Sequence, residues 1–253
     1  MSYKRVMNKA AVPSMILGLV VAVGLAFGIS TRAAAGACVA PVFDDGSHSH
    51  SLAARMVEEY GFHITFAVIS QPMIEAGPSD WHLSVDAVRA LRDAGHEIAC
   101  HGRTHAALTE LNPSQKADEI LGCRQQLRDT VVDPLTFVYP YGLEDEKVIE
   151  IVRAAGFIAA RGVQPGLNDQ STDRYRLYSY SVMRDTTPVE VLNWITQAQE
   201  QEKLLILTFH EVVENPSEIS ITPQNLRDHL TTIALSGAPV VTLTEGLTSQ
   251  TCN

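Results

Sequence analysis

The sequence of 253 residues has few basic side chains for its size. It contains 19 Lys and Arg against 29 Asp and Glu, and its formal net charge at pH 7 is −10. Proteins that bind nucleic acid or anionic lipid through bulk charge need the opposite balance. The composition therefore argues against a nucleic-acid partner, whereas a neutral polymer such as a glycan is compatible with it.

Two sequence patterns are also missing. No Gly-x-Ser-x-Gly segment occurs, which disfavours a hydrolase with a serine nucleophile. No internal repeat, low-complexity tract or interdomain linker stands out. The roughly 200 residues beyond the N-terminus are enough for one domain with a sizeable core, so we expect a single domain over residues 36–253.

Long apolar runs are confined to the N-terminus. Residues 1–9 carry three basic side chains and no acid, residues 10–30 are nearly all apolar, and small residues follow. This order is typical of a secretory signal peptide, although the apolar run is long enough to border on a membrane anchor. We expect residues 1–35 to be one or the other, which makes the domain secreted or tethered through its N-terminus. Cleavage would remove four basic residues and no acid, and would lower the net charge from −10 to −14.

The sequence has only four cysteines. An oxidising compartment would allow Cys100 to pair with Cys123 and Cys38 with Cys252. Two other connectivities use the same residues, and buried free thiols are an equal alternative. The connectivity therefore stays open at this point.

Short apolar runs alternate with helical patterns along the chain. The expected strands are residues 38–43, 63–69, 97–100, 135–139, 157–160, 204–209 and 239–243. The expected helices are residues 47–60, 84–94, 144–155 and 187–202, with two more that begin at residues 114 and 222. This rhythm predicts an α/β fold with parallel strands and right-handed crossovers, closed or distorted into a barrel. In such barrels the site lies at the C-terminal ends of the strands.

Two adjacent carboxylates end the first expected strand. Asp44 and Asp45 follow the apolar run 38–43 and precede Gly46. Neighbouring residues of a pleated strand point in opposite directions, so the two acids should have different roles. One could bind a cation while the other takes a proton; a chemically silent Asp-Gly turn is the alternative.

Two histidines follow the expected strand 97–100. His101 and His105 have three residues between them, a spacing that commonly holds a divalent metal. With an Asp from the end of another strand, they predict a ligand set of two His and one Asp. Three protein ligands leave room for water, which is the arrangement of catalytic rather than structural sites.

At five places the sequence resembles the NodB-type polysaccharide deacetylases, carbohydrate esterase family 4. The resemblance runs from about Val39 to Leu247, and the matching segments are Phe43–Gly46, Ile64–Val68, His101–His105, Tyr139–Gly142 and Leu207–His210. It implies a distorted (β/α)7-type barrel and hydrolysis of an N-acetyl group on a glycan. It also implies that Asp45, His101 and His105 hold a divalent metal, for which zinc is suitable, as cobalt or nickel would be.

The resemblance also implies catalytic roles. Asp44 would be the base that takes a proton from water, and the backbone amide of Tyr141 would stabilise the oxyanion. His210 would be the general acid that protonates the leaving amine. Taken singly, a buried structural histidine and a plain Pro-Tyr-Gly turn are the alternatives for the last two.

The sequence departs from the family pattern in two respects. Val138 and Tyr139 stand where many relatives have an Arg that orients the base, and the Asp and Trp of the fourth motif are not recognisable near residues 164–169. Tyr-Pro-Tyr-Gly without this Arg resembles the subgroup that includes extracellular poly-N-acetylglucosamine deacetylases. We hypothesise that Arg161, at the end of the strand 157–160, substitutes for the missing Arg and holds Asp44; a surface Arg in a loop is the alternative.

Three further side chains follow or precede these motifs and have two interpretations each. His48 and His50 could line the cleft or bind a stray metal, although solvated loop residues are the simpler interpretation. Trp81 could stack on a sugar ring or pack over a helix.

We expect a metal-dependent carbohydrate N-deacetylase that acts on a polymer containing N-acetylglucosamine. The alternatives are a sugar-binding protein with impaired catalysis and an O-acetyl esterase or amidase with another substrate.

Overall fold

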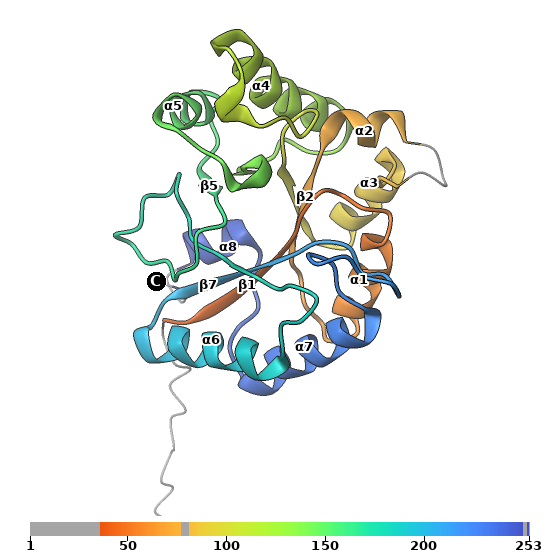
Figure 1. Cartoon of the computed structure of the whole chain (residues 1–253), viewed down its shortest axis with the longest axis vertical. Coiled ribbons are helices and arrows are strands. Elements are labelled where there is room, and N and C mark those ends of the chain that lie inside the picture. The colour runs from red at the N-terminus through yellow and green to blue at the C-terminus, as the bar shows by residue number, and fades with distance from the viewer. Residues whose placement is uncertain (1–35, 77–80, 250–251, 253) are drawn as a thin grey trace, which may run out of the picture. The chain divides into compact units, whose positions relative to one another are not determined.

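The computed structural model describes residues 36–76, 81–249 and 252, so the expected signal peptide or anchor lies outside the described residues. The centre of the fold is a parallel sheet of seven strands (Figure 1). In spatial order these are β5 (Ala159–Arg161), β4 (Thr136–Val138), β3 (Glu97–Cys100), β2 (Thr65–Val68), β1 (Cys38–Phe43), β7 (Leu204–Phe209) and β6 (Tyr180–Ser181). Among the described residues, no helix is long and apolar enough to cross a bilayer.

The two longest strands, β1 and β7, lie side by side in the sheet, and β7 is followed only by the edge strand β6. They pair in parallel over six residues, from Cys38 opposite Leu204 to Phe43 opposite Phe209, and every one of these residues is buried. A strand that is buried on both faces reads as a continuous apolar run, which explains why both sets of bounds were predictable from the sequence.

The segment from Arg174 to Ser181 bridges the two edges of the sheet. At one edge the Leu177 N–H donates to Ala160 O (3.0 Å), and Leu177 O accepts from Gly162 N–H (3.0 Å). A few residues later, β6 pairs with Leu207 and Thr208 of β7. The sheet therefore curls into a half-barrel whose open side is bridged by this segment, which confirms the expected distorted (β/α)7-type barrel in one domain.

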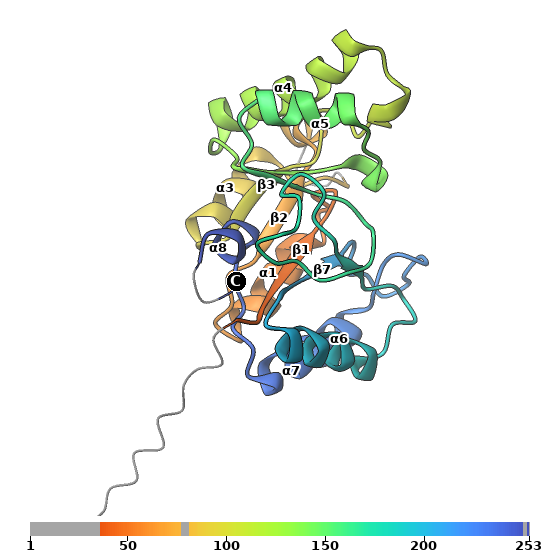
Figure 2. The same cartoon turned by 90° about the vertical axis from the view of Figure 1, so that its left-hand side faces the viewer.

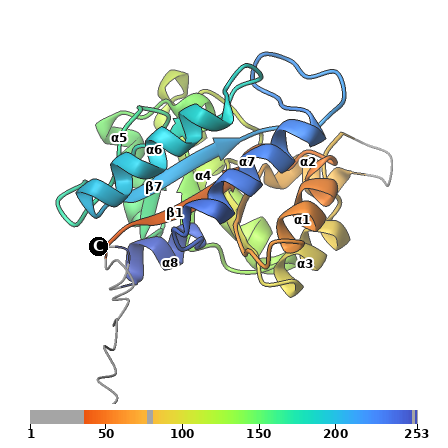
Figure 3. The ribbon, with the colours of Figure 1, turned by 90° about the horizontal axis from the view of Figure 1, so that it is seen from below.

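Helices cover the outside of the sheet. They are α1 (His50–Glu58), α2 (Ser70–Glu75), α3 (Val85–Asp93), α4 (Pro113–Thr130), α5 (Glu146–Ala154), α6 (Pro188–Gln201) and α7 (Pro223–Ser236), whereas α8 (Leu243–Thr248) packs against the inner face. Helices α4 and α5 lie side by side (Figure 2), and α6 and α7 pack together over β1 and β7 (Figure 3). Both α4 and α6 begin with a capping box followed by Pro, which supplies partners for the free N–H groups of the first turn.

Alternate strand residues face two different layers. Val39 and Phe43 of β1 belong to the core between sheet and helices, whereas Ala40 and Val42 belong to a second cluster with Leu243 of α8. This second cluster fills the inside of the half-barrel and is rich in small residues, namely Ala40, Ala67, Ala99 and Ala159. Even-numbered residues of β1 and odd-numbered residues of β3 and β5 therefore face inward.

The four cysteines, whose connectivity the sequence left open, form two disulfides. Cys100 of β3 is bonded to Cys123 of α4, and Cys38 of β1 is bonded to Cys252. The first bond crosses from the outer face of the sheet to a covering helix, and the second ties the C-terminal end of the chain to the central strand.

The last predicted strand, residues 239–243, is wrong. Only Val240 makes an isolated bridge to Val39, and Thr242 instead caps α8 by accepting a hydrogen bond from the Glu245 N–H. Thr242 and Glu245 form a capping box, so a helix-start signal outweighed the apolar pattern. Helix α2 and the two-residue strand β6 were not anticipated, because neither is long enough to show a period.

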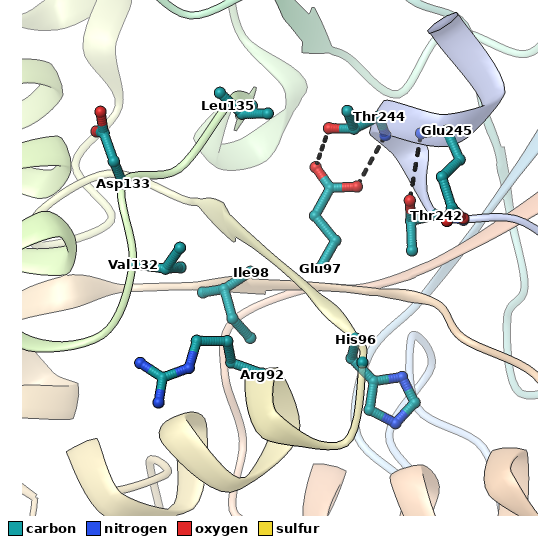
Figure 4. Close-up of a pocket in the computed structure, with 11 residues that line it drawn as sticks. Arg92, His96, Glu97, Ile98, Val132, Asp133, Leu135, Thr242, Thr244 and Glu245 are labelled. Carbon is teal, nitrogen blue, oxygen red and sulfur yellow. Dashed lines mark hydrogen bonds between the residues drawn. The ribbon is translucent and has the colours of Figure 1, made fainter. Parts of the chain in front are cut away.

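Glu97 of β3 faces inward at the N-terminal end of the strands, opposite the end where the site is expected. Its carboxylate accepts hydrogen bonds from Thr65 Oγ1 (3.1 Å), Thr136 Oγ1 (2.6 Å), Thr244 N–H (2.8 Å) and Thr244 Oγ1 (2.8 Å). It lines a cavity of about 250 Å³, in which Thr244 and Glu245 of α8 lie beside it (Figure 4). Because threonines already occupy both carboxylate oxygens, Glu97 is a structural link between three strands and α8.

Replacing Glu97 by Ala should lower the free energy of unfolding by about 3 kcal/mol, since hydrogen bonds to a charged group contribute that order of stability and this half-buried carboxylate accepts four of them. Chemical denaturation would measure the loss. Glu97→Gln keeps the size but has one oxygen acceptor instead of two, so we expect a smaller loss. Equal stability of the Ala variant and the wild type would contradict this role.

His229 of α7 is fully buried, and neither of its ring nitrogens has a hydrogen-bond partner among the described residues. Burial lowers its pKa, and burial also lowers the pKa of His50 to about 4. Both histidines are neutral in the folded protein, but in the unfolded chain they take up protons below the ordinary histidine pKa of about 6.5. The free energy of unfolding should therefore fall as the pH drops from about 6.5 toward 4. Denaturation at pH 7.5 and pH 5 should show a smaller difference for His229→Leu than for the wild type, and an unchanged difference would contradict this assignment.

Candidate active site

The candidate site lies at the C-terminal ends of β1, β3, β4, β5 and β7. Continuing the alternation of each strand places Asp44 after β1, His101 after β3 and Arg161 of β5 on the inner face of the half-barrel. All three side chains are buried. Three segments that are distant in the sequence thus send polar side chains into one small volume.

Asp45, His101 and His105 converge. Asp45 Oδ1 lies 3.2 Å from His101 Nε2 and 3.4 Å from His105 Nε2, and the two Nε2 atoms are 3.1 Å apart. Among the described residues this is the only group of three or more His, Cys, Asp or Glu side chains with the spacing of a metal site. The structure therefore brings together all three of the predicted ligands.

The His101 ring is oriented by a backbone carbonyl. Its Nδ1 lies 2.9 Å from Val138 O at the end of β4, and a carbonyl can only accept, so Nδ1 carries the proton. Nε2 is then the ring nitrogen that faces Asp45 and His105, and it can bind a cation when it carries no proton. Histidines that bind metals commonly have such a partner on the second ring nitrogen.

This donor set fits a divalent cation. In a tetrahedral zinc site with bonds of about 2.0–2.1 Å, neighbouring ligand atoms lie about 3.3–3.4 Å apart. The three separations of 3.1–3.4 Å are close to that value. Two imidazole nitrogens and one carboxylate oxygen are ligands that zinc accepts, and a fourth position is left for water or substrate.

The electrostatics of the three groups are coupled. Burial raises the pKa of Asp45, but its hydrogen bond to His101 and the charges of the nearby histidines outweigh this and hold the carboxyl ionised. Burial lowers the pKa of His101, but the hydrogen bond to Asp45 and the charges of Asp44 and Asp45 leave it above the usual value. Burial and the neighbouring His101 lower the pKa of His105. One cationic charge is therefore favoured between these groups, and a bound cation would replace that proton.

Backbone strain is concentrated at the site. Among the described residues, four that are not glycine have positive φ, and three of them are Asp45 (76°), His105 (66°) and Tyr141 (59°). Such conformations cost free energy and persist only where the surroundings enforce them. At Asp45 the left-handed conformation breaks the strand alternation and turns its carboxylate toward the histidines.

Arg161 contacts Asp44, as the sequence led us to hypothesise. Arg161 Nη2 lies 2.5 Å from Asp44 Oδ1 and 2.6 Å from Oδ2, and the Arg161 side chain is fully buried. It is therefore not a surface Arg in a loop. Asp44 and Asp45 have separate partners, because Asp44 pairs with an arginine and Asp45 with two histidines.

Tyr141 lies in the turn after β4. The residue is 61% exposed, and the centroid of its ring lies 4.5 Å from that of the His105 ring. Its N–H makes no backbone hydrogen bond within the described part of the chain, although those of Gly142 and Leu143 do. A free N–H in a strained turn beside the His105 ring is available to a ligand oxygen.

His210 follows β7, and its Nδ1 is buried without a hydrogen-bond partner among the described residues. Its backbone carbonyl lies 3.2 Å from His50 Nε2.

The interpretation of His50 as a solvated loop residue is wrong. It is fully buried in the first turn of α1, edge-on to Phe43 at 5.3 Å. The sequence located α1 within residues 47–60 but did not indicate that the histidine at its start is buried. His48 is exposed, as expected.

Trp81 is 45% exposed. Its indole N–H donates to Glu211 Oε1 (2.7 Å), and its carbonyl accepts from the His48 N–H. The indole is therefore held by the residue that follows His210, with part of its surface open.

The comparisons with known proteins agree with this geometry. A family model described as polysaccharide deacetylase matches residues 31–160, just over half of the chain. This range includes Asp44, Asp45, His101, His105 and Tyr141 but ends before Arg161 and His210. No curated protein sequence matches the chain significantly.

Solved structures of deacetylases have the same fold. A putative polysaccharide deacetylase from Mycobacterium smegmatis has a TM-score of 0.61 at 15% identity, over 84% of this chain and 89% of that one. A Streptococcus pyogenes deacetylase in complex with acetate has a TM-score of 0.57 at 16% identity, over 60% and 67%. The Xyl-CE4 domain of a xylanase from the hindgut metagenome of Trinervitermes trinervoides has a TM-score of 0.56 at 20% identity, over 83% and 89%.

At these identities the structural likeness establishes the fold, and the family model establishes the relationship. This chain therefore belongs to the polysaccharide deacetylase family and is a hydrolase of the carbohydrate deacetylase type.

Proposed function

We propose that this protein removes N-acetyl groups from an extracytoplasmic polysaccharide that contains N-acetylglucosamine, and that it needs a divalent metal, most suitably zinc. The observation that carries the proposal is the convergence of Asp45, His101 and His105 beside the buried carboxylate of Asp44. Members of the family generally depend on a metal. The Tyr139–Gly142 segment supports assignment to the subgroup that includes poly-N-acetylglucosamine deacetylases.

Each catalytic role is assigned to a group that the fold holds in place. A metal bound by the three ligands would polarise the acetyl carbonyl and lower the pKa of a bound water. Asp44, oriented by Arg161, takes the proton from the attacking water. The Tyr141 N–H donates to the oxyanion, and His210 gives a proton to the leaving amine.

An extracytoplasmic location is supported by the two disulfides, because such bonds persist in oxidising compartments. The composition of residues 1–35 supports export through a signal peptide or tethering through an anchor. A neutral glycan also suits a chain with a net charge of −10.

The test is acetate release from a panel of N-acetylglucosamine oligomers and O-acetylated xylan, with and without a chelator. We expect release from the N-acetylated oligomers, loss of release with the chelator, and recovery on addition of Zn²⁺. Preference for the xylan would indicate the O-acetyl esterase alternative. Binding of the oligomers without any release would indicate the impaired sugar-binding alternative.

Arg161→Ala should lower kcat about 100-fold, because a misplaced catalytic group can cost that much. Metal content should stay at the wild-type level, since Arg161 contacts Asp44 rather than the ligands. Steady-state acetate release and metal analysis would be measured together. Unpairing a buried charge also destabilises the fold, so Arg161→Lys, which keeps the charge, serves as the matched variant. Wild-type turnover in the Ala variant would contradict the positioning role.

A further inference from the structure

The loop between the two histidines is held by a carboxylate from a covering helix. Glu119 of α4 is only 7% exposed, and it directs both oxygens at this loop. Its Oε2 accepts from the Arg103 N–H (3.0 Å) and the Thr104 N–H (2.9 Å), and its Oε1 accepts from Thr104 Oγ1 (2.6 Å). Within the described part of the chain, every hydrogen bond of this carboxylate goes to residues that lie between His101 and His105.

Glu119 is not the charge partner of Arg103. The Arg103 guanidinium pairs with the neighbouring Asp118, whose side chain is largely exposed, at 2.6 Å. Glu119 instead accepts hydrogen bonds from two consecutive backbone N–H groups, which point to the same side of the chain. Successive N–H groups of this kind form an anion-binding concavity, here occupied by a side chain of the protein itself.

The loop conformation that Glu119 stabilises is the one that brings the ligands together. Gly102 and His105 both have positive φ, 76° and 66°, so the chain reverses tightly between the two imidazoles. A Cβ atom on Gly102 would lie 3.2 Å from Pro140 Cγ and 3.4 Å from Glu119 Oε2. The loop is therefore packed between α4 and the turn that carries Tyr141, and little space remains for another conformation.

Helix α4 is attached to this region at a second point. Cys123, one helical turn after Glu119, is bonded to Cys100, the residue before His101. The disulfide fixes the start of the loop, whereas the Glu119 carboxylate fixes its middle. Because the disulfide and the rest of α4 remain, a change at Glu119 should leave the fold in place.

We propose that Glu119 is a positioning residue for the metal centre, which holds the loop 102–104 so that His101 Nε2 and His105 Nε2 face a common cation. This inference rests on the metal site of the proposed function and is independent of the substrate. Loss of an outer partner of a metal ligand typically costs 10–100-fold in affinity. We expect a loss of this size from Glu119→Ala.

The test is the affinity of the metal-free full chain for Zn²⁺, measured by competition with a chromophoric chelator. Glu119→Ala should bind Zn²⁺ about 10–100-fold more weakly than wild type. Glu119→Gln should be intermediate, because its single amide oxygen still accepts from the backbone N–H groups. The matched control, Asp118→Asn, removes the adjacent exposed acid and should keep wild-type affinity.

A second readout separates positioning from general stability. The absorption spectrum of bound Co²⁺ reports ligand geometry, and it should change in Glu119→Ala but not in Asp118→Asn. If Glu119→Ala has a lower Tm but unchanged Zn²⁺ affinity and Co²⁺ spectrum, Glu119 is merely structural and the inference is overturned. If that variant fails to fold, unchanged values in Glu119→Gln overturn it equally. A wild-type protein that binds neither ion would overturn the metal site itself, whereas tight binding without acetate release would overturn only the proposed activity.

Discussion

Asp44→Asn should lower kcat for acetate release about 10²–10⁴-fold, the usual contribution of a general base. Asparagine has nearly the same shape as aspartate but cannot take a proton from water. The Asp44 carboxylate is buried and is held at 2.5 and 2.6 Å by Arg161, which fixes its orientation. Steady-state kinetics on N-acetylglucosamine oligomers would measure the effect.

Two controls accompany this variant. Metal content should be unchanged, because Asp44 is not among the three converging ligands. Removing the charge leaves Arg161 buried and unpaired, which can destabilise a protein by about 3–5 kcal/mol, so thermal unfolding must show that the variant is folded at the assay temperature. A folded Asp44→Asn variant with the wild-type rate would exclude Asp44 as the base.

His101→Ala should abolish both metal binding and turnover. Its Nε2 atom is within 3.2 Å of both other ligand atoms, so its removal leaves only two ligands for the metal. The loss should exceed the roughly 10–100-fold that removal of an outer partner costs. Metal analysis and acetate release on the same preparations would test both effects.

His63→Ala is the matched control for this variant. His63 is exposed and belongs to none of the contacts of the site, so its removal should leave metal content and turnover unchanged. Retention of a full equivalent of metal by folded His101→Ala would show that the cation lies elsewhere.

The central strands were predictable because their apolar runs are continuous. The bounds of β1, β3 and β7 agree with the expectation from the sequence, since these strands are buried and end at polar residues or turns. The structures of the segment 239–243 and of β6 could not be predicted, because strand pairing in such short segments depends on neighbours that are distant in the sequence. At Thr242 the capping box with Glu245 starts helix α8 in place of the expected strand.

The predicted ligands and the contact of Arg161 with Asp44 followed from strand ends and from a resemblance in motifs. Glu119 could not be found in the same way. A glutamate in an amphipathic helix is normally read as part of the solvated face, and only the packing of α4 on the loop turns it inward. The burial of His50 was missed for a similar reason, since a polar residue at the start of a helix carries no sign of the aromatic cluster around it.

The most direct measurement of the central claim is the anomalous scattering of a crystal grown with Zn²⁺, recorded on both sides of the zinc absorption edge. The account predicts one strong peak at bonding distance from Asp45 Oδ1, His101 Nε2 and His105 Nε2, with the Asp44 carboxylate beside it and not bound to it. A peak bound to other side chains, or no peak at these three atoms in a zinc-saturated crystal, would contradict the account.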